Sequence, residues 1–295
     1  MIEKRQWAGR HADEVRRALV FEPRGHADMC GAVLTEPCSP GAQAGVLFFQ
    51  SGGFTTMSGH GLLAVTRIAL DRGLIMPGGD GSTIVFDTPA GMVRATAAGE
   101  RVTYTNVPSF VLHAGLPVHV ASRTLLADVA YGGAFYAIVD GESAGLAIDA
   151  DHAGDLRRLG VDIARTLERA HVITHPLEPA NGGIHATVFT GPPHEGGADL
   201  RNAAVFSDGS VDRSPCGTGT SAVMAVLDAM GLLGEDRPFV HESLLGTRFT
   251  GRVAARTAVG DYPAIVTEIE GTAWITGDHT FVIDDRDPLK NGFRL

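Results

Sequence analysis

Cysteine is scarce in this sequence, and no stretch of it is strongly apolar or strongly charged. The 3 cysteines among 295 residues are too few and too scattered for a disulfide framework or a zinc cluster. No run approaches the roughly 18 uncharged apolar residues that a membrane-spanning helix needs. Residues 1–17 are charged throughout and lack the apolar core of a signal peptide. These absences predict a cytoplasmic protein with reduced thiols.

The charge is also modest. The formal net charge is −10, and no five consecutive residues carry the same charge. This balance argues against nucleic acid or an anionic membrane as the main partner. With 44% hydrophobic residues, the chain can bury a sizeable core and has room for two domains.

Short apolar runs bounded by Gly, Pro, Asn and Asp are the commonest pattern. They predict strands at residues 44–49, 82–87, 101–107, 185–190, 263–271 and 280–284. Helical periodicity is rarer, and it predicts helices at residues 61–70, 161–170 and 220–232. Many strands and few helices, without a regular alternation of the two, predict an α+β fold.

Two segments about half the chain apart match each other. Residues 57–65 (MSGHGLLAV) align with residues 215–223 (PCGTGTSAV), and each has Ser or Cys, then Gly-x-Gly, then an apolar helical pattern. The glycines let backbone N–H groups converge on a ligand, and a helix start adds unpaired donors and partial positive charge. Two such ends facing each other predict a cradle for one carboxylate, flanked by Ser58 and Cys216.

The position of Cys216 predicts its chemistry. A thiol near helix N-termini has a lowered pKa, so we expect a thiolate near neutral pH, able to exchange a proton with a Cα atom. A dinucleotide site is excluded because GTGTSA follows DRSPC instead of an apolar strand and lacks the G-x-G-x-x-G spacing. A serine hydrolase is excluded because no G-x-S-x-G surrounds Ser58, although a plain helix-capping serine stays open.

Residues 212–222 (DRSPCGTGTSA) resemble, without a break, the second-cysteine motif of the proline racemase family. This family includes hydroxyproline 2-epimerases and trans-3-hydroxy-L-proline dehydratases. Residues 57–60 (MSGH) are similar to its first motif, Met-Cys-Gly-His, with serine in place of cysteine. Further similarity lies in residues 22–29, 191–193 and 284–293.

The resemblance implies a cofactor-independent enzyme with a fold like that of diaminopimelate epimerase. Such a fold has two similar domains, each a rolled β-sheet around a central helix, with the active site between them. By this analogy the first domain spans residues 1–113 plus 266–295 and carries Ser58. The second spans residues 114–265 and carries Cys216.

The resemblance also implies roles for the residues of the two motifs. Cys216 stands at the second catalytic cysteine of the family, and Ser58 stands where the first would be. The substrate carboxylate is implied to bind the backbone amides of the next residues in each motif: Gly59, His60, Gly217 and Thr218.

Three further residues are implied to contact the substrate ring. Asp212 matches the aspartate that pairs with the ring amine, a suitable task for a carboxylate. Phe206 falls where the family often places an aromatic residue against the ring. His185 is a candidate for recognising a ring hydroxyl, with a purely structural histidine as the alternative. The implied partner is a small imino acid, with no metal, and the implied assembly is a homodimer.

Serine at position 58 leaves the exact reaction open. An alcohol is a far weaker acid than a thiol, whose reference pKa is about 8.5, so racemisation by two thiols is disfavoured. Family members with Ser and Cys at these positions include hydroxyproline 2-epimerases. We therefore expect epimerisation at Cα of 4-hydroxyproline, with the Cys216 thiolate as base and Ser58 on the opposite face.

Two alternatives remain. Dehydration of trans-3-hydroxy-L-proline needs one base only, although dehydratases of the family typically keep the first cysteine and have threonine at the second position. A hydroxyproline-binding protein with impaired turnover is the other. Family members also open with a strand carrying an Asp-x-His-Thr-Gly-Gly-type segment, whereas the stretch that begins at Met1 resembles the part of those proteins after this strand. We therefore expect the first sheet to lack that strand and to have an unpaired edge.

Overall fold

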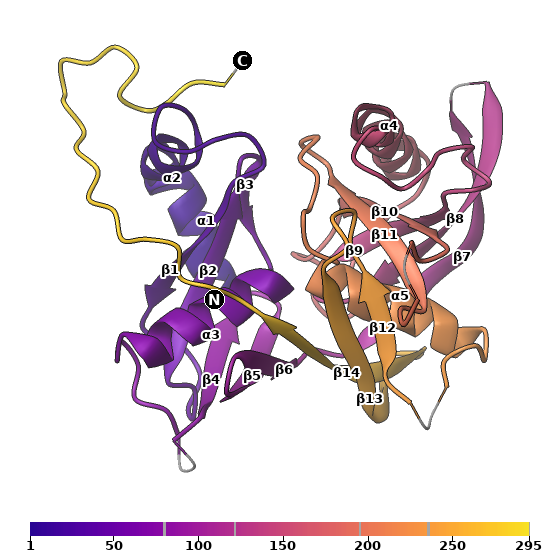
Figure 1. Ribbon diagram of the computed structural model, residues 1–295, viewed down its shortest axis with the longest axis horizontal. Helices are drawn as coiled ribbons and strands as arrows, with labels where there is room; N and C mark the ends of the chain where they lie inside the picture. The colour runs from indigo at the N-terminus through magenta and orange to yellow at the C-terminus, as the bar shows by residue number, and fades with distance from the viewer. Residues whose placement is uncertain (79–80, 121, 195, 235–236, 295) are drawn as a thin grey trace. The chain divides into compact units, whose positions relative to one another are not determined.

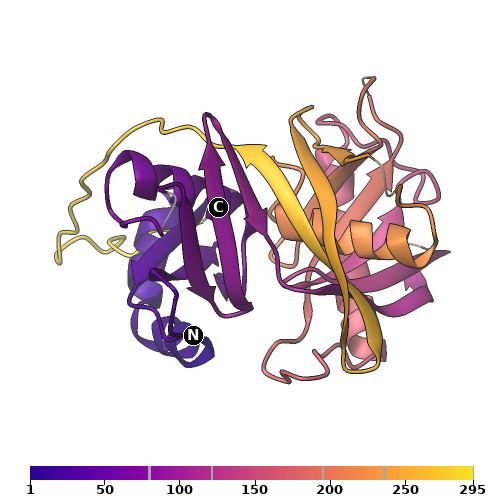
Figure 2. The same cartoon turned by 90° about the horizontal axis from the view of Figure 1, so that it is seen from below.

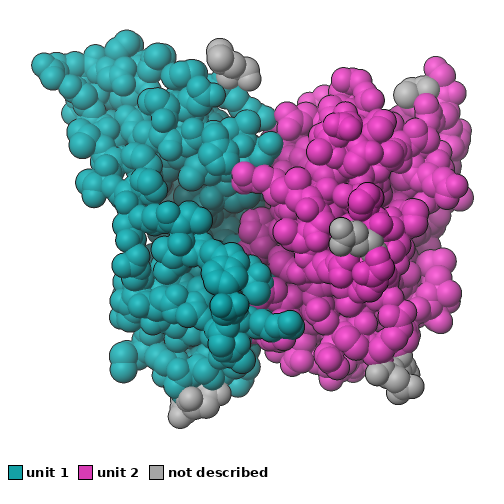
Figure 3. Space-filling model, in the orientation of Figure 1, with its two compact units in different colours: residues 1–57, 61–102, 272–295 teal, residues 58–60, 103–271 magenta. Residues whose placement is uncertain are grey.

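The computed structural model describes residues 1–78, 81–120, 122–194, 196–234 and 237–294 (Figure 1). Its contacts divide the chain into two compact units (Figure 3). Unit 1 consists of Met1–Met57, Gly61–Val102 and Thr272–Leu295, and unit 2 consists of Ser58–His60 and Thr103–Gly271. The domain borders expected after residues 113 and 265 stay a prediction.

Unit 1 contains a mixed sheet. Its strands are β1 (Cys30–Thr35), β2 (Ala44–Gln50), β3 (Gly53–Thr55), β4 (Thr83–Thr88) and β5 (Gly91–Ala98). Strand β2 pairs antiparallel with β1 and β3 and parallel with β4, and β4 pairs antiparallel with β5. Every residue of β2 is buried, which explains why its sequence AGVLFFQ shows an apolar run without alternation.

Three helices accompany this sheet. Helix α1 (Ile2–His11) packs on β3, α2 (Asp13–Val20) packs on β2, and α3 (Gly59–Asp71) lies across the strands (Figure 1). The sequence pattern predicted α3 but neither N-terminal helix. In α2 the buried positions include Arg16, whose guanidinium donates to the Gln50 carbonyl oxygen at 2.7 Å.

The strand predicted at residues 280–284 is wrong. This segment has no regular secondary structure, and Phe281, Val282 and Ile283 are 43%, 79% and 46% exposed. Apolar residues alone do not make a strand, because a strand also needs a neighbouring backbone to accept and donate its hydrogen bonds.

Unit 2 contains a closed barrel. Its strands are β7 (Ser109–Val120), β8 (Arg123–Tyr131), β9 (Phe135–Asp140), β10 (Ile184–Gly191), β11 (Leu200–Phe206), β12 (Phe239–Glu242), β13 (Arg248–Val259) and β14 (Tyr262–Thr272). They neighbour one another in chain order, and the pairing of β14 with β7 closes the ring. The last two form a long hairpin (Figure 2). Strand β6 (Arg101–Thr105) precedes the barrel.

Helix α5 (Gly217–Ala229) is the core of this barrel. It contacts β7, β8, β9 and β13, and its residues from Gly217 to Val226 are all buried. Helix α4 (Ala153–Ala170) packs one face on β7, β10 and β11, and the glycine at position 160 allows a close approach to Val205. The predicted α+β class is confirmed, as are five of the six predicted strands, which appear as β2, β4, β6, β10 and β14. No helix of the described residues is long and apolar enough to cross a membrane.

Candidate functional site

The two matched turns meet backbone to backbone in unit 2. A Cβ atom placed on Gly59 would lie 2.8 Å from the Gly217 Cα and 2.9 Å from the Thr218 nitrogen, closer than real side chains come. Helix α3 begins at Gly59 and α5 begins at Gly217, so each turn is a helix N-terminus. The structure therefore brings together the backbone amides of two helix starts, which is the arrangement that attracts an anion.

Tyr104 of β6 lies against both turns. Its hydroxyl would be 2.3 Å from a Cβ atom on Gly59 and 2.5 Å from one on Gly217. The side chain is fully buried, and burial together with the nearby Cys216 raises the pKa of Tyr104, so the phenol stays protonated. No motif in the sequence pointed to this residue.

Cys216 occupies a tightly held turn immediately before α5. It is 3% exposed, and its φ of 60° lies in the left-handed region that residues other than glycine rarely adopt. Its amide donates to the Ser214 hydroxyl at 3.1 Å, and its carbonyl accepts from the Thr220 amide at 2.6 Å. The Ser214 amide and hydroxyl both donate to Asp212 Oδ1 at 2.9 Å. Hydrogen bonds therefore hold the backbone of the turn on both sides of the Cys216 side chain.

The pKa of the Cys216 thiol differs from the sequence prediction. Burial raises it, the charge of Asp212 raises it further, and the hydroxyl of Tyr136 opposes both only in part. The expected thiolate at neutral pH is therefore wrong for the free protein. The helix start is present as predicted, but a sequence pattern does not show how deeply the sulfur is buried.

Asp212 supplies a buried negative charge beside this turn. Its side chain is 3% exposed, and Oδ2 lies 3.5 Å from His60 Nδ1. Burial alone would raise the pKa of Asp212, but His60 and the hydrogen bonds from Ser214 outweigh burial and lower it. Among the described residues Oδ2 has no hydrogen-bond partner. An ionised oxygen in this state is suited to a cationic ligand.

Aromatic side chains from three adjacent strands pack against one another, and one of them, Tyr136, contacts Cys216. Strand β10 pairs with β9 and β11 in a register that places Ala186 opposite both Tyr136 and Phe206. The register of β10 with β9 shifts between Ile184 and Ala186, and His185 at this irregularity lies edge-on to both rings, with centroid distances of 5.8 Å to Tyr136 and 5.0 Å to Phe206. Burial lowers the pKa of His185 to about 4, against the opposing charges of Asp208 and Asp212, so its imidazole is neutral at pH 7.

Tyr136 connects the aromatic group to the thiol. Its hydroxyl is 2.6 Å from Thr218 Oγ1 and accepts a hydrogen bond from Cys216 Sγ at 3.7 Å. Sequence reasoning missed this residue, because a tyrosine within an apolar strand carries no signal of its own.

Ser58 is half-buried and directly precedes α3, between the buried Met57 and Gly59. All the predicted site residues thus belong to unit 2.

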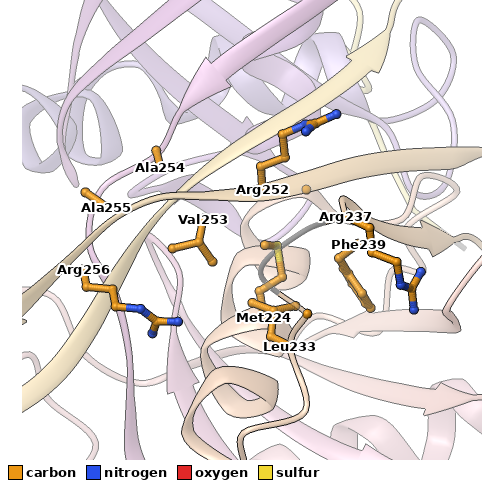
Figure 4. A pocket seen from close by; sticks show the side chains of 11 residues that line it. Met224, Leu233, Arg237, Phe239, Arg252, Val253, Ala254, Ala255 and Arg256 are labelled. Carbon is orange, nitrogen blue, oxygen red and sulfur yellow. The ribbon is translucent and has the colours of Figure 1, made fainter.

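A separate cavity of about 340 Å³ lies near the other end of α5 (Figure 4). Buried Met224 and Phe239 line it, together with arginines of which two are engaged in ion pairs. Arg237 pairs with Asp199, and Arg256 pairs with Asp228, each at 2.6 Å. This cavity contains none of the predicted site residues.

Known proteins resemble the chain over its whole length. A model of the proline racemase family matches residues 1–294. A trans-3-hydroxy-L-proline dehydratase of Bacillus cereus is 42% identical over 299 residues, which cover 100% of this chain and 90% of that protein. A 3-hydroxyproline 2-epimerase of Burkholderia multivorans is 39% identical, with 99% and 89% covered.

Solved structures give the same result. A hydroxyproline epimerase from Agrobacterium vitis, solved with bound trans-4-hydroxy-L-proline, has a TM-score of 0.92 at 31% identity, covering 100% of this chain and 86% of that chain. The family match, the whole-length relatives and this shared fold agree with the two motifs at Ser58 and Cys216. The chain belongs to the proline racemase family.

Proposed function

We propose that the protein removes the Cα proton of a hydroxyproline through Cys216, and that its reaction is the dehydration of trans-3-hydroxy-L-proline. The observation that carries this proposal is the unequal pair of turns, in which the one thiol, Cys216, is opposed by an alcohol. The thiol stands in the second motif, whereas dehydratases of the family typically have theirs in the first. Dehydration needs one strong base. The 42% identity to a dehydratase along the whole chain supports the same choice over the epimerisation expected from the sequence.

The substrate would bind through its two charged groups. Its carboxylate accepts hydrogen bonds from the backbone amides of residues 59–60 and 217–218, where two helix starts meet. Its ring ammonium pairs with Asp212 Oδ2, the buried oxygen without a hydrogen-bond partner among the described residues. Phe206 and the neutral His185 then pack against the ring, and His185 has a ring nitrogen to offer to a hydroxyl.

Binding of the ammonium also activates the thiol. The charge of Asp212 is one cause of the raised pKa of Cys216, and an ammonium beside Asp212 cancels that charge. The N-terminus of α5 then favours the thiolate. The thiol is thus protonated in the free protein and becomes a base only when a cationic substrate is bound.

The chemical step depends on these positions. The thiolate takes the Cα proton, and the electron pair left at Cα spreads into the carboxylate held by the helix starts. That pair then forms the C2–C3 double bond as the C3–O bond breaks. The leaving oxygen, which lies on the same ring face as the Cα proton in the trans isomer, keeps the bonding electrons, takes the proton from the Cys216 thiol and departs as water. The enamine product accepts a proton at C3 and becomes the cyclic imine, pyrroline-2-carboxylate.

Epimerisation at Cα of 4-hydroxyproline is the second candidate. It shares the first step but requires a proton to be returned on the opposite face, where Ser58 or a water that it holds would act as donor. The structural similarity to the Agrobacterium vitis hydroxyproline epimerase favours this candidate.

Proton NMR in D₂O separates these reactions. The protein is incubated with trans-3-hydroxy-L-proline and trans-4-hydroxy-L-proline in parallel, with Cys216→Ala as the control. We expect loss of the 3-hydroxy substrate and formation of pyrroline-2-carboxylate. A Cα-deuterated stereoisomer of the 4-hydroxy substrate, with its hydroxyl retained, would instead show an epimerase. Thermal stabilisation by pyrrole-2-carboxylate without any Cα exchange would show a binding protein.

A further inference from the structure

A buried group of polar side chains holds the peptide immediately before Cys216. The Pro215 carbonyl oxygen accepts two hydrogen bonds, from Asn202 Nδ2 at 2.8 Å and from Thr220 Oγ1 at 3.1 Å. Both donors also contact the ring of His241, each at 2.9 Å. Asn202 comes from β11, His241 from β12 and Thr220 from α5, so three separate elements converge on one carbonyl.

These contacts form a closed ring of hydrogen bonds when His241 carries its proton on Nδ1. Thr220 has a single hydroxyl proton, which it donates to Pro215, so its oxygen accepts from His241 Nδ1–H. His241 Nε2 is then an acceptor, and the second amide proton of Asn202 reaches it at 2.9 Å. Each donor in the ring has an acceptor, and the imidazole is neutral.

Burial keeps the ring in this state. Asn202, Thr220 and His241 are each no more than 1% exposed. Burial lowers the pKa of His241 to about 3, so it carries no charge at the pH of the cell. The buried Asn202 Oδ1 has no hydrogen-bond partner among the described residues. The bonds that the ring does make are nevertheless hard to break, because breaking any one of them leaves a further buried polar group without a partner.

The ring acts on the strained residue of the site. Thr220 bonds to the carbonyls on both sides of Cys216, with its hydroxyl to Pro215 and its amide to the Cys216 carbonyl. Cys216 has φ 60°, a conformation that persists only where the surroundings enforce it. We infer that Asn202, Thr220 and His241 are positioning residues for Cys216, which fix the Pro215 carbonyl and so hold the thiol in its left-handed turn.

This inference rests on the proposed role of Cys216, and a set of threonine variants tests it. Thr220→Val removes the hydroxyl at nearly constant shape, whereas Thr220→Ser keeps the hydroxyl. Thr187→Val is the matched control, because Thr187 is equally buried in unit 2 and donates to the Gly160 carbonyl at 2.7 Å, away from the ring. Two measurements are made on each variant: kcat and KM in the D₂O assay, and peptide-resolved alkylation of Cys216 by iodoacetamide as a function of pH.

For Thr220→Val we expect kcat to fall about ten-fold or more while KM changes less than about two-fold, because misplacement of a reacting group acts on the chemical step. Alkylation of Cys216 should become faster and shift to lower pH, because the released thiol leaves its buried position. Thr220→Ser should restore both properties, and Thr187→Val should change neither.

The inference fails if Thr220→Val and Thr187→Val behave alike, or if Thr220→Ser is as impaired as Thr220→Val. It is also separable from the proposed function. If the wild-type protein removes the Cα proton of no substrate, by dehydration or by exchange, the function is wrong, but the alkylation profiles of the same variants still decide whether the ring positions Cys216.

Discussion

The Ser58 turn (residues 58–60) and the Cys216 turn (residues 216–218) share a sequence pattern but differ in their surroundings. Cys216 is buried, has a left-handed backbone and is bonded through its own amide and carbonyl. Ser58 is half-buried, and His60 at the end of its turn keeps 31% of its side chain exposed. The pattern thus specifies a helix start in both places, whereas the neighbouring side chains determine the acid–base strength of the residue before it.

The largest expected effect is the difference in activity between a variant of the Cys216 turn and a variant of the Ser58 turn. Cys216→Ala should lower the rate of Cα proton removal by about 10³-fold or more, because it removes the only base proposed for this step. Ser58→Ala should cost about 10-fold or less, because the proposed dehydration moves its proton on the Cys216 face alone. The measurement is the loss of the Cα proton signal of trans-3-hydroxy-L-proline, followed by proton NMR in D₂O. Equal losses in the two variants would mean that the two residues act as an equivalent pair.

Asp212→Asn removes the buried negative charge next to the Cys216 turn. We expect KM to rise about 10-fold to 100-fold, because a hydrogen bond to a charged group is lost. The same variant should let iodoacetamide alkylate Cys216 at lower pH, since the charge of Asp212 raises the pKa of the thiol. Alkylation at unchanged or higher pH would show that Asp212 does not control the thiol.

Glycine variants test the close backbone contact that the two turns make with each other. Gly59→Ala and Gly217→Ala each place a methyl group within 3.0 Å of the opposite glycine and against the Tyr104 hydroxyl. Each should lower the free energy of unfolding by about 1–3 kcal/mol, as measured by urea denaturation. Gly154→Ala in α4 is the control, because a Cβ there meets nothing within 4 Å. A glycine variant as stable as this control would contradict the close contact.

The smallest expected effect is a dependence of stability on pH. His241 has a pKa of about 3 in the folded protein, against 6.5 for an ordinary histidine. As the pH falls below 6.5 the unfolded chain binds this proton first, so stability is lost between pH 6.5 and about 3. At pH 5 this loss is on the order of 2 kcal/mol.

Urea denaturation at pH 7 and pH 5 measures this dependence. In His241→Gln the difference between the two pH values should be smaller than in the wild type. His152→Gln is the control on the surface, where Asp149 raises the pKa of His152 and the sign is reversed. An unchanged difference in His241→Gln would mean that His241 is already protonated in the folded state at pH 5.

The parts of the molecule that were predicted from sequence have strong local patterns. Helices α3 and α5 and five strands follow from apolar runs between turn residues, and the pair Ser58–Cys216 follows from a repeated motif. Helix α5 nevertheless begins at Gly217, before the predicted start at residue 220. Residues without a motif, such as Tyr104 and Tyr136, were not predicted, since sheet register and the contact of the two turns bring them to the site.

The raised pKa of Cys216 was also not predicted from the sequence, because it depends on residues that are distant along the chain. A helix start is a local property that a sequence displays, whereas desolvation of the sulfur depends on the barrel that encloses it. The Asn202–Thr220–His241 ring is assembled from residues far apart in the sequence. Thr220 lies within the motif at residues 212–222, but neither Asn202 nor His241 stands in a pattern that would mark it beforehand.

The closure of the unit 2 barrel has a consequence for how the chain folds. The closing pair joins Ser109 and Phe110 of β7 to Ile265 and Ala264 of β14, the first and last strands of the ring. The first ten residues of helix α5 are all buried, so the helix gains little from forming before the strands surround it. Closing a loop over such a separation is costly, so folding of this unit should be slow. The barrel cannot close until β14, its last strand, has been synthesised. The thiol would then become enclosed only in the final stage of folding.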